Sequence, residues 1–185
     1  LGAEGPVGLI TYMRTDSVAL AEKFLNEARG YLQQTFGKDF LPAKPHQYIT
    51  KSKLAQEAHE AIRPTEADRE PASLKDALEP RLWKLYDLIW KRALASQMTE
   101  AIFEATAADI ANNDGKYIFR ATGNIIVFPG YLKLYPEARK ESVLPALMEK
   151  EKLELLKIEP LQHFTEPRAR YNDASLVKTL EEYGF

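Results

Sequence analysis

The hydrophobic pattern of the chain changes near residue 98, and no other feature limits its fold as strongly. Before this point apolar residues recur at helical spacing, most clearly over residues 80–98. The expected apolar stripe of that helix is Leu82, Leu85, Tyr86, Ile89, Trp90, Ala93 and Leu94. After it, residues 102–111 and 117–128 are rich in β-forming residues, and the Asp114-Gly115 pair between them favours a hairpin turn. Helices followed by strands argue against an alternating βα fold and predict an α+β multi-domain fragment, mainly helical first and β-rich afterwards.

Three further elements are expected in the first half. Residues 9–13 are largely β-branched, aromatic or apolar, follow a glycine-rich stretch and predict a short buried strand. Residues 14–17 offer several N-caps for a helix that extends to about residue 34. Another helix is expected over residues 53–62 and ends there because the residue before Pro64 disfavours helical geometry.

The second half adds glycines with a structural meaning and a last helix. Gly123 and Gly130 interrupt the second β-forming run and predict bends or bulges. The remaining expected elements are a turn with a short helix over residues 71–77, a strand over residues 152–158, and a helix over residues 174–183 capped by Asn172 or Asp173.

Composition excludes several classes of site. The 185 residues are 45% hydrophobic and 28% charged, which is typical of a folded globular chain. The absence of cysteine removes disulfides, thiol nucleophiles and thiolate metal sites, and the histidines His46, His59 and His163 are too scattered to predict zinc. The net charge of -2 means that a polyanionic partner must be held by local cations. No nucleotide phosphate-binding loop motif is present.

The sequence also carries information on location and completeness. No run approaches the roughly 18 apolar residues of a membrane span, and the N-terminus lacks the pattern of a signal peptide. We therefore expect a cytoplasmic protein with no membrane partner. The chain begins without a Met and stops just after the end of an expected helix, at Gly184, so we expect it to be a piece of a longer protein.

The first polar cluster runs from Tyr12 to Ser17, between the expected strand and the expected helix. A helix N-terminus attracts an anionic phosphate, and Arg14 adds a guanidinium that binds phosphate with two hydrogen bonds. Tyr12 and Arg14 are two residues apart, so they lie on the same side of an extended segment. The alternative is structural: Tyr12 packs in the strand, and Asp16 and Ser17 cap the helix.

Two more clusters combine cations with aromatic or polar residues. His59 and Arg63 lie on one face if the expected helix continues to residue 63. The alternative is a half-exposed histidine and an arginine that binds the last helical carbonyls. Between residues 162 and 171, Arg168 and Arg170 alternate with aromatic residues, which suits the phosphates and bases of a single strand. By count alone, such a segment is more often an ordinary surface loop.

Together these clusters resemble the three signatures of the type IA DNA topoisomerases, in the same order. The first is Gly-Leu-Ile-Thr-Tyr-Met-Arg-Thr-Asp-Ser at residues 8–17, and the second is His-Glu-Ala-Ile-Arg-Pro-Thr at residues 59–65. The third extends over residues 162–183, from Gln-His-Phe-Thr through Ala-Ser-Leu-Val-Lys to Glu-Glu-Tyr. Met13 favours the bacterial topoisomerase I branch, because a proline is common there in the topoisomerase III branch.

The resemblance implies a role for each candidate residue. Tyr12 is the nucleophile that becomes joined to a 5′ phosphate, Arg14 holds the scissile phosphate, and His59 assists as a hydrogen-bond donor or in proton transfer. Arg63 orients its loop or contacts the DNA backbone, and Arg168 and Arg170 also belong to the DNA-binding residues. Ionising an ordinary phenol, with a pKa of about 10, costs about 4 kcal/mol at pH 7, so a positive group or a base must offset this cost. Exchange of one phosphodiester for another needs no ATP.

The resemblance also implies what lies outside this chain. The family binds Mg²⁺ in an acidic Toprim domain, and the chain has no D-x-D-x-E pattern, so no metal site is expected here and the chain is not expected to relax DNA alone. The implied partners are single-stranded DNA, negatively supercoiled DNA and the rest of its own polypeptide, in the bacterial cytoplasm at the nucleoid. The implied domains are a helical tyrosine domain over 1–98, part of a β-rich arch over 99–165, and the start of a single-stranded DNA-binding domain over 166–185.

Two other functions remain open at this point. The chain is alternatively a non-catalytic module for single-stranded nucleic acid, in which Tyr12 stacks on a base instead of attacking phosphate. A helical and hairpin scaffold without any DNA role is the third possibility.

Overall fold

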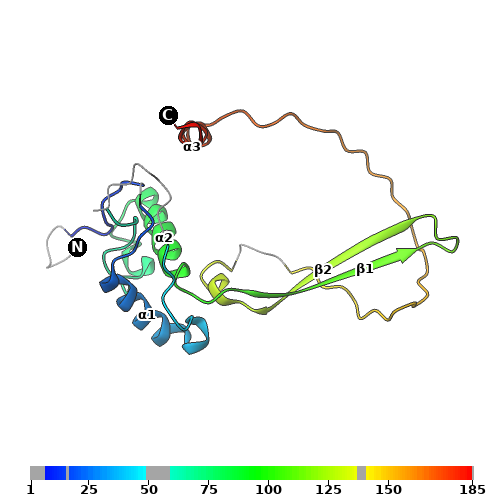
Figure 1. Cartoon of the computed structure of the whole chain (residues 1–185), viewed down its shortest axis with the longest axis horizontal. Coiled ribbons are helices and arrows are strands. Elements are labelled where there is room, and N and C mark those ends of the chain that lie inside the picture. The colour runs from blue at the N-terminus through cyan, green and yellow to red at the C-terminus, as the bar shows by residue number, and fades with distance from the viewer. Residues whose placement is uncertain (1–6, 16, 49–58, 137–140, 185) are drawn as a thin grey trace. The chain divides into compact units, whose positions relative to one another are not determined.

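The structure is a computed structural model and describes residues 7–15, 17–48, 59–136 and 141–184. In chain order its elements are α1 (Glu22–Phe36), η2 (Lys38–Phe40), η3 (Pro71–Leu74), α2 (Pro80–Ala95), β1 (Ile102–Ala111), β2 (Ile118–Phe128), η4 (Gly130–Lys133) and α3 (Asp173–Tyr183) (Figure 1). Contacts divide the chain into two units, Leu1–Ala146 and Leu147–Phe185, which are described separately. Helices with a two-stranded antiparallel sheet confirm the α+β class.

The core of the first unit forms between α1 and α2. In α1 the buried residues Phe24, Ala28 and Leu32 follow one another at a spacing of four, which aligns them on one face. In α2 the buried residues are Tyr86, Trp90, Ala93 and Leu94. Of the seven residues of the predicted stripe, these four are buried, Ile89 is partly buried, and Leu82 and Leu85 near the start of the helix are exposed.

Aromatic side chains of α2 hold the loop over residues 67–71 against the helix. Trp83 Nε1 donates to the Pro71 carbonyl at 2.7 Å, Tyr86 Oη donates to the Arg69 carbonyl at 2.8 Å, and Trp90 Nε1 donates to the Ala67 carbonyl at 2.9 Å. The three acceptors are every second residue of the loop. They bind the donors of the helix in reverse order, so the loop runs antiparallel to α2. Burial raises the pKa of Tyr86 to about 12, so this donor keeps its proton over the physiological range.

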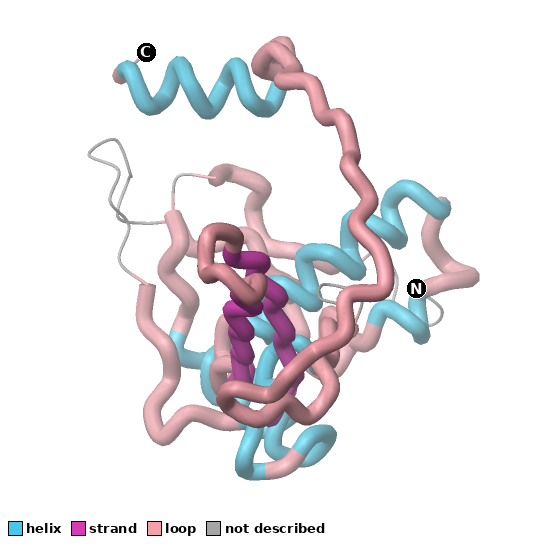
Figure 2. The backbone as a smooth tube through the Cα atoms, turned by 90° about the vertical axis from the view of Figure 1, so that its right-hand side faces the viewer, coloured by secondary structure: helices cyan, strands magenta, loops and turns pink. Residues whose placement is uncertain are grey.

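The predicted hairpin is confirmed. β1 pairs with β2 in antiparallel register over ten residue pairs, with one irregularity between Ile102 and Phe103 (Figure 2). Gly115 has a φ of 69° in the turn, a left-handed conformation that favours glycine. Across the pair, Arg120 donates to both carboxylate oxygens of Asp109, and this hydrogen bonding lowers the pKa of Asp109.

The two glycines of the second β-forming run differ in role. Gly130 follows β2 with a φ of 47°, and a Cβ there would clash with the backbone of Thr99 and Glu100, so the predicted bend is present. Gly123 stays inside β2. A Cβ at this position would lie 2.9 Å from the Ser142 carbonyl oxygen, so glycine leaves room for the backbone of Ser142. Residues 142–144 therefore cover part of β2, and an isolated bridge joins Asn124 to Ser142.

The base of the hairpin is attached to the helical part. The Thr99 amide donates to the Phe40 carbonyl at 2.9 Å, and the Tyr131 amide donates to the Thr99 carbonyl at 2.9 Å. The rings of Phe40 and Phe128 lie 5.0 Å apart. Backbone hydrogen bonds and an aromatic contact therefore connect the end of β2 with the loop after α1.

Two predicted strands are wrong. Residues 9–13 form only an isolated bridge between Ile10 and Pro64, and Tyr12 and Met13 are 62% and 68% exposed instead of buried. Residues 152–158 are exposed throughout and have no regular secondary structure. In both segments the β-forming composition lacks a continuous partner strand, without which an extended segment has no ladder.

The predicted starts and ends of two helices also need correction. α1 begins at Glu22, and its N-cap Ala21 has no side-chain cap; Ser17 Oγ instead accepts from the Ala19 amide at 3.2 Å. Asp16 lies outside the described residues. Of the helix predicted over residues 53–62, the part up to residue 58 also lies outside them, and residues 59–62 are not helical. His59 and Arg63 are therefore not paired by helical spacing.

The second unit confirms the last predicted helix. α3 begins after Asn172, whose side chain accepts from the Ser175 amide at 2.8 Å, while the Ser175 hydroxyl accepts from the Asn172 amide. This reciprocal pair is a capping box. Gly184 ends the helix with a φ of 86°. Within the described part of the chain, no helix has the length and apolar character needed to cross a membrane.

Candidate active site

Tyr12 and His59 lie side by side, although they come from different sequence motifs. Their ring centroids are 5.7 Å apart and the ring planes are inclined by 33°. Both belong to irregular segments of the first unit. A phenol and an imidazole at this separation can act on one substrate group.

Main-chain pairing between residues 9–11 and residues 61–65 creates this contact. The Thr11 amide donates to the Arg63 carbonyl at 2.9 Å, and the Thr65 amide donates to the Leu9 carbonyl at 3.0 Å. Thr11 Oγ1 donates to the Ala61 carbonyl at 2.9 Å and accepts from the Arg63 amide at 3.1 Å. The residue before Tyr12 is therefore fixed to the segment that follows His59.

The Tyr12 side of the site is open to solvent. Tyr12 is 62% exposed, and Arg14 is exposed two residues further along the chain. Arg14 and His59 both take part in interactions within the chain. An exposed phenol beside an imidazole, with a guanidinium close in sequence, has the groups needed for attack on a phosphodiester: a nucleophile, a hydrogen-bond donor and a positive charge.

Arg63 has a different environment. Its side chain is only 11% exposed. Its Nε and Nη2 donate to the Glu60 carboxylate at 3.0 and 2.8 Å, and Nη1 donates to the Pro64 carbonyl at 2.9 Å. The guanidinium carbon lies 4.6 Å from the ring centroid of Phe24, in a cation–π contact. The guanidinium is therefore engaged on all its nitrogens within the chain, which favours the loop-orienting role over the DNA contact.

Glu60 is the functional candidate that the sequence analysis did not single out. Besides Arg63, its carboxylate accepts from the Ala21 amide at 3.2 Å, at the start of α1. One signal pointed to it: a glutamate three residues before an arginine commonly forms an ion pair. The contact with Ala21 is long-range and has no signal in the sequence.

Arg168 and Arg170 lie in the second unit, just before α3. Both side chains are exposed, as are the neighbouring residues, including Phe164 and Tyr171. Exposed arginines interleaved with exposed aromatic rings are compatible with single-stranded nucleic acid.

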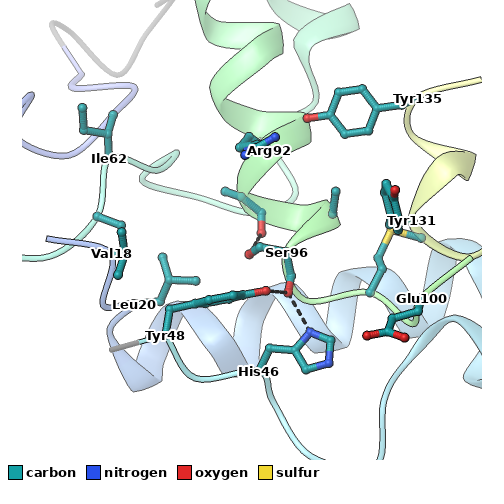
Figure 3. A pocket seen from close by; sticks show the side chains of 14 residues that line it. Val18, Leu20, His46, Tyr48, Ile62, Arg92, Ser96, Glu100, Tyr131 and Tyr135 are labelled. Atoms are coloured by element: carbon teal, nitrogen blue, oxygen red, sulfur yellow. Dashed lines mark hydrogen bonds between the residues drawn. The ribbon is translucent and has the colours of Figure 1, made fainter. Parts of the chain in front are cut away.

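A cavity of about 490 Å³ adjoins the second motif in the first unit. Ala61 and Ile62 form part of its wall, as do Arg92 of α2 and Ser96, which follows this helix (Figure 3). The Ser96 carbonyl lies 2.9 Å from His46 Nδ1 and also accepts from the Tyr48 hydroxyl at 2.9 Å. His46 and Tyr48 are therefore both bonded to Ser96 at one side of the cavity.

The described residues do not supply a magnesium site. Among them, no three acidic or histidine side chains converge. Glu60, the carboxylate next to His59, is already bonded to Arg63 and the Ala21 amide. This donor set does not fit a hard divalent cation.

Comparisons with known proteins agree with the motifs. Residues 5–185 match the family model for DNA topoisomerase. DNA topoisomerase 1 of Helicobacter pylori is 48% identical over 181 residues, which cover 98% of this chain and 24% of that protein. DNA topoisomerase 1 of Xylella fastidiosa is 47% identical over 193 aligned positions, which cover 100% of this chain and 24% of that protein.

A solved structure has the same fold. Full-length topoisomerase I from Thermotoga maritima matches with a TM-score of 0.77 and 34% identity, over 96% of this chain and 28% of that one. The chain thus spans about a quarter of the length of the curated relatives it matches. The resemblance predicted from the three motifs is confirmed: the chain belongs to the DNA topoisomerase family, in its bacterial type IA branch.

Proposed function

We propose that this chain carries the nucleophile of a DNA topoisomerase that breaks and rejoins single strands. Tyr12 Oη attacks the phosphorus of a phosphodiester in single-stranded DNA and forms a bond to the 5′ phosphate. The bond from phosphorus to the 3′ oxygen of the preceding nucleotide breaks. Tyr12 loses its phenolic proton and the leaving 3′ oxygen gains one, so the exchange releases no net proton. Rejoining is the reverse reaction, so no ATP is consumed.

Arg14 and His59 assist this exchange. The Arg14 guanidinium holds the scissile phosphate and stabilises the negative charge that develops on its oxygens. His59, beside the Tyr12 ring, donates a hydrogen bond to the phosphate or takes part in the movement of the proton. Arg63 orients its own loop, which also carries His59.

The remaining proposals concern the whole protein. Arg168 and Arg170 contact the backbone of single-stranded DNA. Residues 1–98 form the tyrosine domain, residues 99–165 belong to a β-rich arch, and residues 166–185 begin a DNA-binding domain. Mg²⁺ is bound by other parts of the same polypeptide, and the complete enzyme relaxes negatively supercoiled DNA in the bacterial cytoplasm. The isolated 185 residues are inactive in relaxation.

The contact between the exposed Tyr12 and His59 is the observation that carries the proposal. Its test is a denaturing gel of the full-length protein with an oligonucleotide labelled at its 3′ end, so that the label stays on the fragment whose 5′ phosphate is joined to Tyr12. We expect a protein-linked label that disappears in Tyr12→Phe while DNA binding is retained. Persistence of the adduct in Tyr12→Phe would refute the assignment.

A second candidate rests on exposed aromatic rings. Tyr12 and Tyr171 are 62% and 66% exposed, and such rings stack on unpaired bases. In a non-catalytic binding module, Tyr12→Phe keeps the ring and therefore the affinity, and the wild-type protein forms no adduct. The same gel therefore separates the two functions.

A further inference from the structure

We propose that Glu60 is a positioning residue, which fixes the loop bearing Tyr12 and Arg14 relative to His59. This inference rests on the proposed function. Glu60 does not touch the substrate in this account. It acts by joining the start of α1 and the Arg63 guanidinium to the segment that carries His59.

The stretch that carries Tyr12 and Arg14 is attached on both sides, at Thr11 and at Ala19, to the same short segment. At its beginning, Thr11 bonds to the backbone of Ala61 and Arg63, as described above. At its end, the Ala61 amide donates to the Ala19 carbonyl at 2.7 Å, and the Ala21 amide donates to Glu60 Oε2 at 3.2 Å. The position of residues 60–63 therefore determines where both ends of the loop lie.

Glu60 supplies a cap that α1 does not provide for itself. The N-cap residue Ala21 has no side chain that can accept a hydrogen bond, and no side-chain cap is present. The Glu60 carboxylate binds the Ala21 amide and brings a negative charge to the positive end of the helix dipole. The start of α1 is thus stabilised by a residue of the second motif.

Arg63 holds this carboxylate in place. Its guanidinium binds both Glu60 oxygens and rests on the fully buried ring of Phe24 in α1. A guanidinium with two bonds to one carboxylate fixes the orientation of the acid, which a single point charge does not. Glu60 is therefore oriented by Arg63, and the loop is oriented by Glu60.

The test is strand cleavage by the full-length protein under single-turnover conditions at saturating oligonucleotide. Glu60→Gln keeps the size of the side chain but replaces one carboxylate oxygen with an amide nitrogen. The side chain then no longer has two oxygens that accept from Arg63. We expect the cleavage rate constant to fall by about 10- to 100-fold, because small displacements of a nucleophile cost this much. The dissociation constant for the oligonucleotide and its salt dependence should change less than twofold, which separates positioning from loss of a DNA contact.

The chain offers a matched control in Glu66→Gln. Glu66 and Arg69 form an ion pair of the same residue types at the same spacing, at 2.7 Å, in the same connecting segment. The Glu66 side chain is half exposed, and the carbonyl of Arg69 is bonded to Tyr86 of α2. Glu66→Gln should therefore cleave at the wild-type rate, and an equal fall in both variants would overturn the proposal.

A second variant removes the cap alone. Ala21 has a φ of -63°, which matches proline, so Ala21→Pro deletes the amide that binds Glu60 and leaves the Glu60–Arg63 pair intact. We expect a similar fall in cleavage rate with retained DNA affinity. If Glu60→Gln does not fold, Ala21→Pro decides: an unchanged rate overturns the inference. If the wild type forms no Tyr12-dependent adduct, the proposed function fails instead.

Discussion

The ring of Tyr12 lies 5.7 Å from the ring of His59, with the ring planes inclined by 33°. This contact joins a nucleophile to a group that can donate or accept a proton. It predicts that His59→Ala in the full-length protein lowers the strand-cleavage rate by about 100-fold or more, because general acid–base assistance contributes at least this factor. Oligonucleotide affinity, measured by fluorescence anisotropy, should stay within about threefold of wild type.

His46→Gln is the control for this variant. His46 bonds to the Ser96 carbonyl at the cavity wall and is assigned no role in the reaction. Wild-type cleavage is expected for His46→Gln. Wild-type cleavage by His59→Ala would show that the imidazole next to Tyr12 plays no part in the reaction.

The aromatic donors of α2 predict the result of a single-atom change. Tyr86→Phe removes the hydroxyl that donates to the Arg69 carbonyl at 2.8 Å. The carbonyl then lacks its partner in a partly buried place, and we expect the free energy of unfolding of the 185-residue chain to fall by about 1–2 kcal/mol. Urea denaturation measures the change. Tyr117→Phe, at an exposed position, should leave the free energy unchanged.

Two tyrosines predict a loss of stability at high pH. Burial raises the pKa of Tyr86 to about 12, and burial together with the hydrogen bond to Glu70 raises the pKa of Tyr31 to about 12. The folded state therefore holds these protons more tightly than the unfolded state. Their contribution is complete below about pH 10 and is lost as the pH rises through about 12.

Unfolding of the chain at several pH values between 8 and about 11.5 measures this loss. The double variant Tyr31→Phe, Tyr86→Phe cannot ionise at these positions, so its stability should decline less steeply than that of the wild type. Equal slopes for the two proteins would contradict the assignment of the pH dependence to Tyr31 and Tyr86.

Gly130 predicts a strong effect of one methyl group. Its φ of 47° and the nearby backbone of Thr99 and Glu100 leave no room for a Cβ. Gly130→Ala should lower the free energy of unfolding by about 2 kcal/mol or more. Gly30, inside α1, has open space around the place of a Cβ, so Gly30→Ala should raise it by about 0.5–1 kcal/mol. Thermal melting of both variants tests whether Gly130→Ala lowers and Gly30→Ala raises the stability of the fold.

Elements with a strong local signal could be predicted from the sequence. α2, the hairpin and α3 are specified by helical periodicity, by the Asp114-Gly115 turn and by the Asn172 cap. The segments over residues 9–13 and 152–158 have β-forming residues as well, but a strand also needs a partner, and partners are not visible in local composition. Family resemblance, not periodicity, singled out Tyr12 and His59.

Contacts between distant segments could not be predicted. The residue types at 14–17 predict caps for α1, whereas the acceptor for the Ala21 amide comes from Glu60. Arg63 was expected to orient its loop or to contact DNA, and its partners Glu60 and Phe24 favour the first role. The contacts of Glu60 with Ala21 and of Arg63 with Phe24 join segments that come together only on folding, whereas the Glu60–Arg63 pair is local in sequence.

The backbone pairing between residues 9–11 and 61–65 has a consequence for protein engineering. The main-chain bonds between the segments that carry Tyr12 and His59 do not depend on side-chain type, whereas the bonds of Thr11 Oγ1 and of the Glu60 carboxylate do. An exchange of residues 59–65 with a homologous enzyme therefore keeps these contacts where the incoming segment has a glutamate at residue 60, and an exchange of residues 7–21 keeps them where it has a threonine at residue 11. For segment exchange, Thr11 and Glu60 are thus the two positions whose side chains must be retained.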